Sequence, residues 1–265
     1  MKIISCIKPT PDPASRLTIN ESKTWIRDQD LTFVASEADN YGLEEALRLK
    51  EKHEGEVVVV SMGGEESAKV LRAGLAMGAD RAIHLFDERF RGADEFAVAR
   101  AVSAAIQKDG GADLVITGVQ SDDLGTGSTG VMLAEFLGWP HATVVIAAEA
   151  RPQEKSLTAK RELEAGLIES IALTLPAVIT VQYGANQPRY ASLKGIMAAK
   201  KKPFVVWTAA DLGLADSETG AAGAMYDVLE IFVPEKKSRV EILNGSPEEA
   251  VTKLVEKLRK EAKAL

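Results

Sequence analysis

The chain has 265 residues, of which 46% are hydrophobic and 27% charged, a balance typical of a folded protein with a substantial core. Its net charge of −7 argues against a general nucleic-acid-binding protein. No apolar run reaches the roughly 18 residues that a membrane span needs, so direct membrane insertion is not expected. The single cysteine, Cys6, and an N-terminus that enters a strand without a basic leader favour a cytoplasmic location.

The first 150 residues predict alternating strands and helices. Apolar runs predict strands at 2–7, 56–61, 82–86, 113–117 and 143–148, with helices between them near 39–54, 66–77, 94–109 and 128–137. Residues 15–33 alternate loosely and suggest an edge hairpin. Short connections in this order predict an open, doubly wound, mostly parallel α/β sheet with its ligand site at the carboxyl ends of the strands.

The pattern changes after residue 150. Runs at 156–163 and 167–175 predict a β-hairpin that turns at Gly166, and a buried strand follows at 177–182. Residues 203–245 show no clear periodicity and are interpreted as an extended arm or covering layer. Ser246-Pro247-Glu248-Glu249 predicts the start of an amphipathic terminal helix. We expect an α/β domain over residues 1–200 and a C-terminal arm with a helix over 201–265.

The loop from Gly118 to Gly130 is the best candidate for a small-molecule site. It follows a predicted strand and precedes a helix, so its glycines, hydroxyls and free N–H groups could hold a phosphate. Gly125-x-Gly127-x-x-Gly130 is formally a dinucleotide fingerprint, but it follows the fourth strand and lacks the acid about 20 residues further on. A tight packing loop without a ligand is the alternative.

Two adjacent acids, Asp122 and Asp123, lie in this loop. They would repel a phosphate unless they turn outward, and they could instead bond a ribose or mark a metal. Surface residues are the simpler interpretation, because no histidine is nearby. His53, His84 and His141 are not paired with a nucleophile, and no metal or P-loop motif occurs. This favours a nucleotide-binding subunit or carrier over an enzyme, with no catalytic or metal-ligating residue predicted.

The segment at residues 186–203 combines a rigid turn, a short helix and a basic end. Pro188 fixes the turn, and Leu193, Ile196 and Met197 at i, i+3 and i+4 predict one or two helical turns. Lys200-Lys201-Lys202 and Pro203 close the segment. Such an element could dock a partner, or it could pack its three apolar residues inward and leave the lysines solvated. Spacing alone favours the second interpretation.

These motifs, in this order, resemble the beta subunit of electron transfer flavoproteins. The resemblance rests on Leu175-Pro176-Ala177-Val178-Ile179-Thr180 and the 186–203 segment, with shorter pieces such as Gly138-Trp139-Pro140, and covers most of residues 1–215. It implies an adenine-nucleotide-binding, Rossmann-like fold. It also implies an alpha subunit that carries most contacts to the redox-active FAD. Electrons would come from acyl-CoA dehydrogenases of fatty acid beta-oxidation and pass to a membrane quinone oxidoreductase, so the chain would be a carrier subunit.

The resemblance also implies a nucleotide in the pocket at the strand ends. AMP is favoured, and a second FAD, as in the electron-bifurcating branch that oxidises NADH, is the alternative. Residues 90–94 resemble the bifurcating branch, whereas residues 98–100 resemble the AMP branch. The positions that correspond to the family's pocket are Cys6, Ser36, Glu37, Ala38, Asp39, Met62, Gly118, Gln120, Asp122, Asp123, Gly125, Thr126, Gly127, Ser128 and Thr129.

For the 186–203 segment, the resemblance reverses the order of the two interpretations. Leu193 would be an anchor that enters a dehydrogenase pocket and points away from the core, with Ile196 and Met197 holding the helix down and Tyr190 and Lys200 beside it. Glu162, next to the hairpin turn, would contact the mobile flavin domain, and the terminal arm would pack on the alpha subunit. A rival of another class is a stand-alone adenine-nucleotide-binding regulatory module of the stress-protein type.

Overall fold

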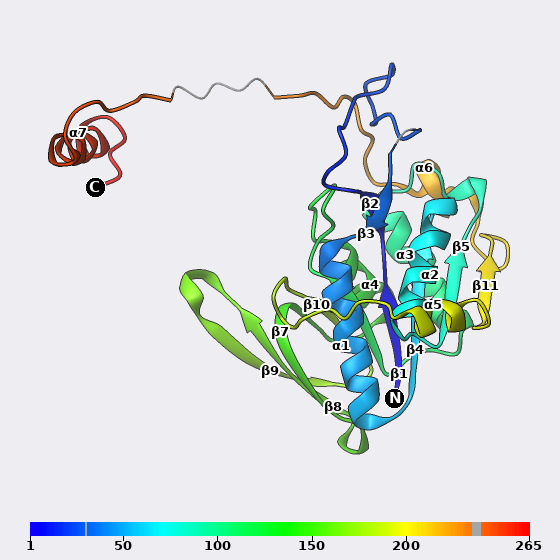
Figure 1. Cartoon of the computed structure of the whole chain (residues 1–265). Helices are drawn as coiled ribbons and strands as arrows, with labels where there is room; N and C mark the ends of the chain where they lie inside the picture. Colours follow the sequence, from blue (N-terminus) through cyan, green and yellow to red (C-terminus); the bar gives the residue numbers. More distant parts are fainter. Residues whose placement is uncertain (30, 235–239) are drawn as a thin grey trace. The chain divides into compact units, whose positions relative to one another are not determined.

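A nine-stranded sheet forms the centre of the computed structural model, which describes residues 1–29, 31–234 and 240–265 (Figure 1). The strands from β11 to β7 in the spatial order run parallel, and β8 and β9 extend the sheet as an antiparallel hairpin. The spatial order is β11 (Phe204–Trp207), β5 (Arg81–Leu85), β4 (Glu56–Met62), β1 (Lys2–Cys6), β6 (Leu114–Gly118), β10 (Ala177–Val181), β7 (His141–Arg151), β8 (Ser156–Glu162) and β9 (Ile168–Thr174).

The strand order reverses at β1. The chain passes from β1 to β4 and β5 on one side, and then returns to place β6 on the other side of β1. Open parallel sheets bind ligands at such a switch point, in the crevice outside the carboxyl ends of the strands. The predicted α/β, doubly wound, mostly parallel fold is therefore confirmed, and it places the ends of β1 and β6 next to each other.

Two pairs of helices cover the two faces of the sheet (Figure 1). The helices α1 (Glu37–His53) and α2 (Glu65–Met77) cover a core that includes Ile3 and Leu75. On the other face, α3 (Glu95–Lys108) and α4 (Thr129–Leu137) cover a core that includes Ile4 and Ile106. Neighbouring residues of a strand point to opposite faces, and both cores are apolar, so the strands read as continuous apolar runs.

The remaining elements are short, apart from the terminal helix of 14 residues. A small antiparallel ribbon follows β1, and single-turn 3₁₀ helices lie in the connections. They are β2 (Pro9–Pro11), β3 (Phe33–Ala35), η1 (Glu88–Phe90), η2 (Pro152–Glu154), η3 (Glu164–Gly166), α5 (Leu193–Ala199), η4 (Asp216–Glu218), α6 (Gly220–Gly223) and α7 (Pro247–Lys260).

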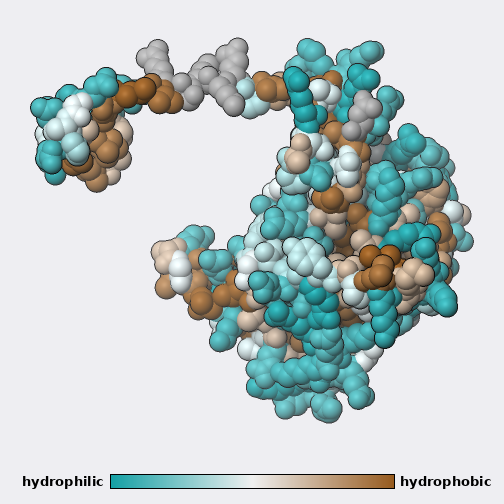
Figure 2. Space-filling view, in the orientation of Figure 1, coloured by the Kyte–Doolittle hydropathy of each residue, from teal (hydrophilic) through white to brown (hydrophobic). Residues whose placement is uncertain are grey.

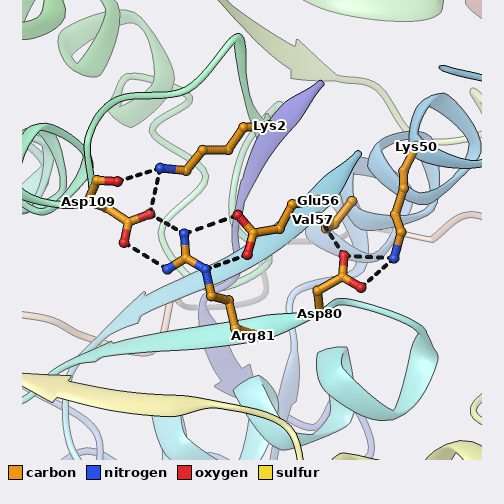
Figure 3. Close-up of polar contacts among 7 residues, drawn as sticks. All are labelled: Lys2, Lys50, Glu56, Val57, Asp80, Arg81 and Asp109. Atoms are coloured by element: carbon orange, nitrogen blue, oxygen red, sulfur yellow. Dashed lines mark hydrogen bonds and ion pairs between the residues drawn. The ribbon is translucent and has the colours of Figure 1, made fainter. Parts of the chain in front are cut away.

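Ion pairs close the amino ends of the central strands (Figure 3). Arg81 at the start of β5 bonds Glu56 at the start of β4 (2.6 Å) and Asp109 after α3, which also accepts from Lys2. Asp80 accepts from Lys50 at 2.6 Å and from the backbone N–H of Val57 at 2.8 Å. The charged residues at this edge are therefore satisfied by one another.

Three expectations about chain organisation need correction. Within residues 15–33 only an isolated bridge joins Ile19 to Ile26 among the described residues, in place of an edge hairpin. Residues 204–207 form β11, an edge strand beside β5, and so do not belong to an arm. The described chain divides into the compact units Met1–Leu229 and Glu230–Leu265, and position 200 lies inside the first.

The second unit contains the predicted terminal helix. Ser246 accepts a hydrogen bond from the backbone N–H of Glu249, and the Glu249 side chain accepts from the backbone N–H of Ser246. This reciprocal capping box, with Pro247 at the first helical position, explains why α7 begins there.

Candidate functional site

Asp39 joins the two loops that meet at the switch point. It lies in the first turn of α1 and is 8% exposed. One carboxylate oxygen accepts from the backbone N–H of Lys8, after β1, at 2.8 Å, and the other from Gly118, at the end of β6, at 2.9 Å. Burial raises the pKa of Asp39 to about 7, although these two hydrogen bonds act in the opposite direction. The carboxyl group therefore holds both strand ends against α1.

Gly118 is required for this contact. A Cβ atom at position 118 would lie 2.6 Å from the Asp39 carboxylate and 2.7 Å from the Cβ of Ala38. A larger residue would push α1 away from the end of β6. Gly130, at the start of α4, is equally confined, because a Cβ there would lie 2.5 Å from a methyl group of Thr180. These glycines let helices approach the strand ends closely.

The two acids of the glycine-rich loop point towards this edge. Asp122 accepts from the backbone N–H of Glu37 at 2.7 Å, so it satisfies the N-terminus of α1, and the Tyr183 hydroxyl donates to it at 2.9 Å. Asp123 pairs with Lys8 at 2.7 Å. Both acids are surface residues, as expected, and each is bonded to other groups of this chain. Among the described residues no group of three or more His, Cys, Asp or Glu could hold a metal ion.

The predicted pocket residues come from four places at the carboxyl edge. Cys6, Met62 and Gly118 are the last residues of the neighbouring strands β1, β4 and β6. Burial raises the pKa of the Cys6 thiol to about 12, so the thiol stays protonated. Ser36 is buried and accepts from the backbone N–H of Asp122 at 3.3 Å. Glu37 and Ala38 follow it in the first turn of α1.

The rest of the loop leads into α4. Gln120, Gly125 and Thr126 are exposed, and Gly127 and Thr129 are half-buried. Ser128 is the N-cap residue of α4, but its side chain makes no capping hydrogen bond. The first N–H groups of α4 are therefore not capped by this side chain. An anion site at a helix N-terminus requires such uncapped N–H groups.

A cavity of about 650 Å³ lies beside this edge. Its apolar lining comes from Pro13, β3 and Ala73 of α2, and polar groups come from Lys69 of α2, the start of α1 and the glycine-rich loop. The lining residues are Pro13, Phe33, Val34, Ala35, Glu37, Asn40, Lys69, Ala73 and Asp122. An apolar wall beside a few polar groups suits a flat, partly apolar ligand.

The 186–203 segment presents its apolar side chains to the surface. The exposed fractions are 97% for Tyr190, 78% for Leu193, 46% for Ile196 and 59% for Met197. Figure 2 shows an apolar patch over α5 with hydrophilic residues around it. The interpretation as a helix that packs these residues inward is wrong. So is the expectation that Ile196 and Met197 hold the helix down, because both are exposed.

Small and basic residues hold α5 instead. A Cβ at Gly195 would lie 2.3 Å from the carbonyl oxygen of Ala76, so only glycine permits the close approach of α5 to α2. Ala199 is 6% exposed. Lys202 donates to the carbonyl oxygens of Leu75 at 2.9 Å and Ala79 at 2.5 Å. Lys200 is exposed, whereas Lys202 satisfies the C-terminal end of α2.

The turn before α5 is bonded to α1. Asn186 donates to the carbonyl oxygen of Tyr41 at 3.0 Å and to Glu45 at 3.2 Å. Arg189 pairs with Glu44 at 2.8 Å and also with Glu51. Sequence reasoning missed Arg189 and Glu44, which lie 145 positions apart. The nearest signal in the sequence was an arginine directly after Pro188, and this pattern does not indicate which residue the arginine contacts.

The hairpin β8–β9 extends the sheet away from the switch point. Glu162 is the last residue of β8, pairs in register with Ile168, and accepts from the Gln182 side chain at 3.3 Å. Leu167 and Ile168 beyond the turn are 64% and 60% exposed. The tip therefore combines an acid with exposed apolar residues.

A membrane-spanning helix would have to be long and apolar, and none of the helices in the described residues meets both conditions.

The fold and this edge define an open, mostly parallel α/β protein with a Rossmann-like sheet. Comparison with known proteins is more specific. Residues 24–212 match the family described as "Electron transfer flavoprotein domain". Over 97% of both chains, the protein is 37% identical to the electron transfer flavoprotein subunit beta of Methylophilus methylotrophus. It is 36% identical to that of Bacillus subtilis over the full length of both.

A third relative carries a different name. The CarD subunit of the caffeyl-CoA reductase-Etf complex of Acetobacterium woodii is 34% identical over 98% of both chains. The chain belongs to the electron transfer flavoprotein family, among its beta subunits, so the resemblance found in the sequence is confirmed.

Proposed function

We propose that the chain is the beta subunit of a heterodimeric electron transfer flavoprotein. In this role it takes electrons from acyl-CoA dehydrogenases of fatty acid beta-oxidation and delivers them to a membrane quinone oxidoreductase. It acts as a carrier, with FAD shared with an alpha subunit. The observation that carries the proposal is the 186–203 segment, whose large apolar side chains face outward while Arg189 and Lys202 bond the chain's own helices.

A helix that exposes its apolar side chains suits a docking surface. Exposed apolar groups on a short helix gain free energy only when a partner covers them, and one well-buried anchor supplies most of the docking energy in many small interfaces. Leu193 is the first residue of α5 and the most exposed of its apolar side chains. We assign it the anchor role, with Tyr190, Ile196 and Met197 around it and Lys200 at the rim.

The carboxyl edge is proposed to hold AMP. Three strand ends meet there, Ser128 leaves the N-terminus of α4 without a side-chain cap, and Asp39 fixes the loops on either side. Lys8 neutralises Asp123, which reduces the repulsion between that loop and a phosphate group. Cys6, Met62 and Gly118 of the predicted pocket set end three neighbouring strands at this edge, which supports the proposal.

The alpha subunit is proposed to cover two further regions. The second unit exposes large apolar residues, among them Phe232 at 74%, Val233 at 75% and Ile242 at 78%, and α7 exposes Val251. A partner chain would remove this apolar area from water. The apolar cavity beside α1 would form one wall of the flavin site, and Glu162 at the hairpin turn would contact the mobile flavin domain.

The nucleotides released from the purified heterodimer test the cofactor assignment. Denaturation followed by chromatography should give one FAD and one AMP per heterodimer. Two FAD and no AMP would instead support electron bifurcation with NADH oxidation, an alternative that CarD's place in a caffeyl-CoA reductase-Etf complex keeps open. A stable, flavin-free monomer that binds ATP would favour the stand-alone regulatory module.

Substitution of the anchor tests the docking assignment. Leu193→Ala should slow flavin reduction by a short-chain acyl-CoA dehydrogenase, with about 2 kcal/mol lost in docking and flavin content unchanged. Leu17→Ala is the matched control, because Leu17 is also exposed, at 53%, and lies outside the segment. Equal reduction rates for Leu193→Ala and the unaltered heterodimer would show that the anchor assignment is wrong.

A further inference from the structure

The 186–203 segment cannot be held in place by its own helix. The helix α5 has 7 residues, and a helix of this length is unstable in water without tertiary contacts. Its large apolar residues are exposed and contribute little burial. Within α5, Gly195 lies against α2 and Ala199 is buried, and the orientation of Leu193 depends further on the contacts on each side of α5. Lys202 supplies one of these at α2, and Arg189 supplies the other at α1.

Arg189 makes a dense set of contacts with two acids of α1. Its Nε and one Nη donate to the two oxygens of Glu44 at 2.8 and 3.1 Å. Both Nη atoms also donate to Glu51, and the backbone N–H of Arg189 donates to Glu44 at 3.1 Å. Glu44 has 4% of its side chain exposed and also accepts from Arg48. Two-pronged pairs of this kind fix direction as well as distance.

We propose that Arg189 is a positioning residue for electron-donor docking, which locks the turn before α5 onto Glu44 and Glu51 so that Leu193 is presented in one orientation. The inference rests on the proposed docking function of the segment. Arg189 directly precedes Tyr190 and lies three residues before the N-cap Ser192, so loss of its contacts frees the start of α5. A segment that is ordered before binding loses less entropy when the partner binds.

Arg189 is unsuited to contact the donor itself. Its guanidinium nitrogens are already bonded to this chain's carboxylates, and only 33% of its side chain is exposed. Burial tends to raise the pKa of Glu44, yet the hydrogen bonds from Arg189 and Arg48 lower it below the ordinary value. The pair is therefore charged at neutral pH, and a partner would have to break it to reach the guanidinium.

The test uses the intact heterodimer in four forms: unaltered, Arg189→Met, Leu193→Ala and the double variant. The donor is a short-chain acyl-CoA dehydrogenase reduced with butyryl-CoA, and the reduction rate is measured against heterodimer concentration. Arg189→Met should raise the KM for the heterodimer about 10-fold and leave the maximal rate and flavin content unchanged. Arg91→Met, which breaks an exposed pair with Glu88, is the matched control and should leave the KM, the maximal rate and the flavin content unchanged.

The double variant separates positioning from other roles. If Arg189 acts through Leu193, the double variant should be no slower than Leu193→Ala alone. The inference would be overturned if the double variant raised the KM by the product of the two single effects. It would also be overturned if Arg189→Met left the KM unchanged. An unchanged KM for Leu193→Ala would instead overturn the docking function on which it rests, so the two failures can be told apart.

Hydrogen exchange gives a second readout that does not depend on the donor. Amides of residues 190–199 should exchange about 10-fold faster or more in Arg189→Met, whereas those of β1 and β6 should not change. Arg189→Lys keeps the charge but loses the two-pronged geometry, so it should give an intermediate effect if the first variant folds poorly. Unchanged protection of residues 190–199 in both variants would contradict the positioning role.

Discussion

Two buried carboxyl groups lie five positions apart on α1 and behave in opposite ways. Asp39 is 8% exposed and Glu44 3% exposed. Asp39 accepts only backbone N–H groups, and burial raises its pKa to about 7. Glu44 is buried as well, but it accepts from two guanidinium groups, and its pKa is lowered. Burial raises the pKa of both groups, but the hydrogen bonds from Arg189 and Arg48 outweigh it at Glu44, whereas two backbone N–H groups do not outweigh it at Asp39.

The difference in pKa matches the different parts of the chain that Asp39 and Glu44 hold. Asp39 joins two loops that are already held by a parallel sheet, so dipoles are sufficient partners. Glu44 holds a surface segment with no apolar core of its own, and a charged, two-pronged partner supplies the missing attachment. One helix thus holds the carboxyl edge through Asp39 near its start and the proposed docking segment through Glu44, about one and a half turns later.

The largest effect is expected from Gly118→Ala, which removes the space that Asp39 occupies. The new Cβ would lie 2.6 Å from the Asp39 carboxylate, so α1 must shift, at a cost of about 3 kcal/mol of unfolding free energy. Urea unfolding followed by circular dichroism measures it. Gly64→Ala is the control, because no atom lies within 4 Å of its Cβ, and the lost N-cap glycine should cost less than about 1 kcal/mol. Equal costs would mean that Gly118 is not confined.

Glu44→Gln is expected to cost about 2 kcal/mol of unfolding free energy, because Arg189 and Arg48 lose their shared buried anion. Urea unfolding of the full chain gives the value. Glu88→Gln removes an exposed partner of Arg91 and should change the unfolding free energy by less than about 0.5 kcal/mol. If Glu44→Gln left the unfolding free energy unchanged, Glu44 would not stabilise the fold through Arg189 and Arg48.

The pH dependence of stability should differ in sign between the two acids. The contribution of Asp39 is present below its unfolded pKa of about 3.9 and is lost as pH rises through about 7. Relative to Asp39→Asn, the natural chain should therefore lose stability between about pH 4 and about pH 7 and change little at higher pH. Relative to Glu44→Gln, it should lose stability only as pH falls below about 4.3, the unfolded pKa of glutamate. Parallel pH profiles for the two variants would contradict the assignment.

The smallest effect is expected from Tyr183→Phe, which removes the 2.9 Å hydrogen bond to Asp122. The loss should be about 1 kcal/mol or less, because Asp122 keeps its contact with the backbone N–H of Glu37. The exchange rate of the Glu37 amide, measured by hydrogen exchange, should rise only slightly. A large rise would mean that Tyr183, and not Asp122, holds the start of α1.

The sequence predicts the regular part of this fold well, because local patterns determine it. Continuous runs such as Val57–Val60 indicate buried parallel strands, and Ser246 with Glu249 indicates a helix start. The position of β11 could not be read in this way. Phe204–Trp207 is short, and its role as an edge strand depends on pairing with β5, more than 100 positions earlier.

The candidate site was predictable in its location but not in its contacts. The glycine-rich loop and Asp39 could be placed at the strand ends from spacing and resemblance. That Asp122 would satisfy the start of α1 could not be seen, since 85 positions separate it from Glu37. The outward direction of Ile196 and Met197 was also missed, because apolar residues at helical spacing usually face a core. Here Gly195 and Ala199 occupy the buried side.

A photo-reactive side chain beside the anchor tests the proposed docking surface most directly. The heterodimer carries benzoylphenylalanine in place of Tyr190, which is 97% exposed, and a matched sample carries it in place of Leu17. Irradiation with a short-chain acyl-CoA dehydrogenase should join the subunit to the dehydrogenase from position 190 and not from position 17. A cross-link from position 190 to the alpha subunit, or none to the dehydrogenase, would contradict the docking role of the 186–203 segment.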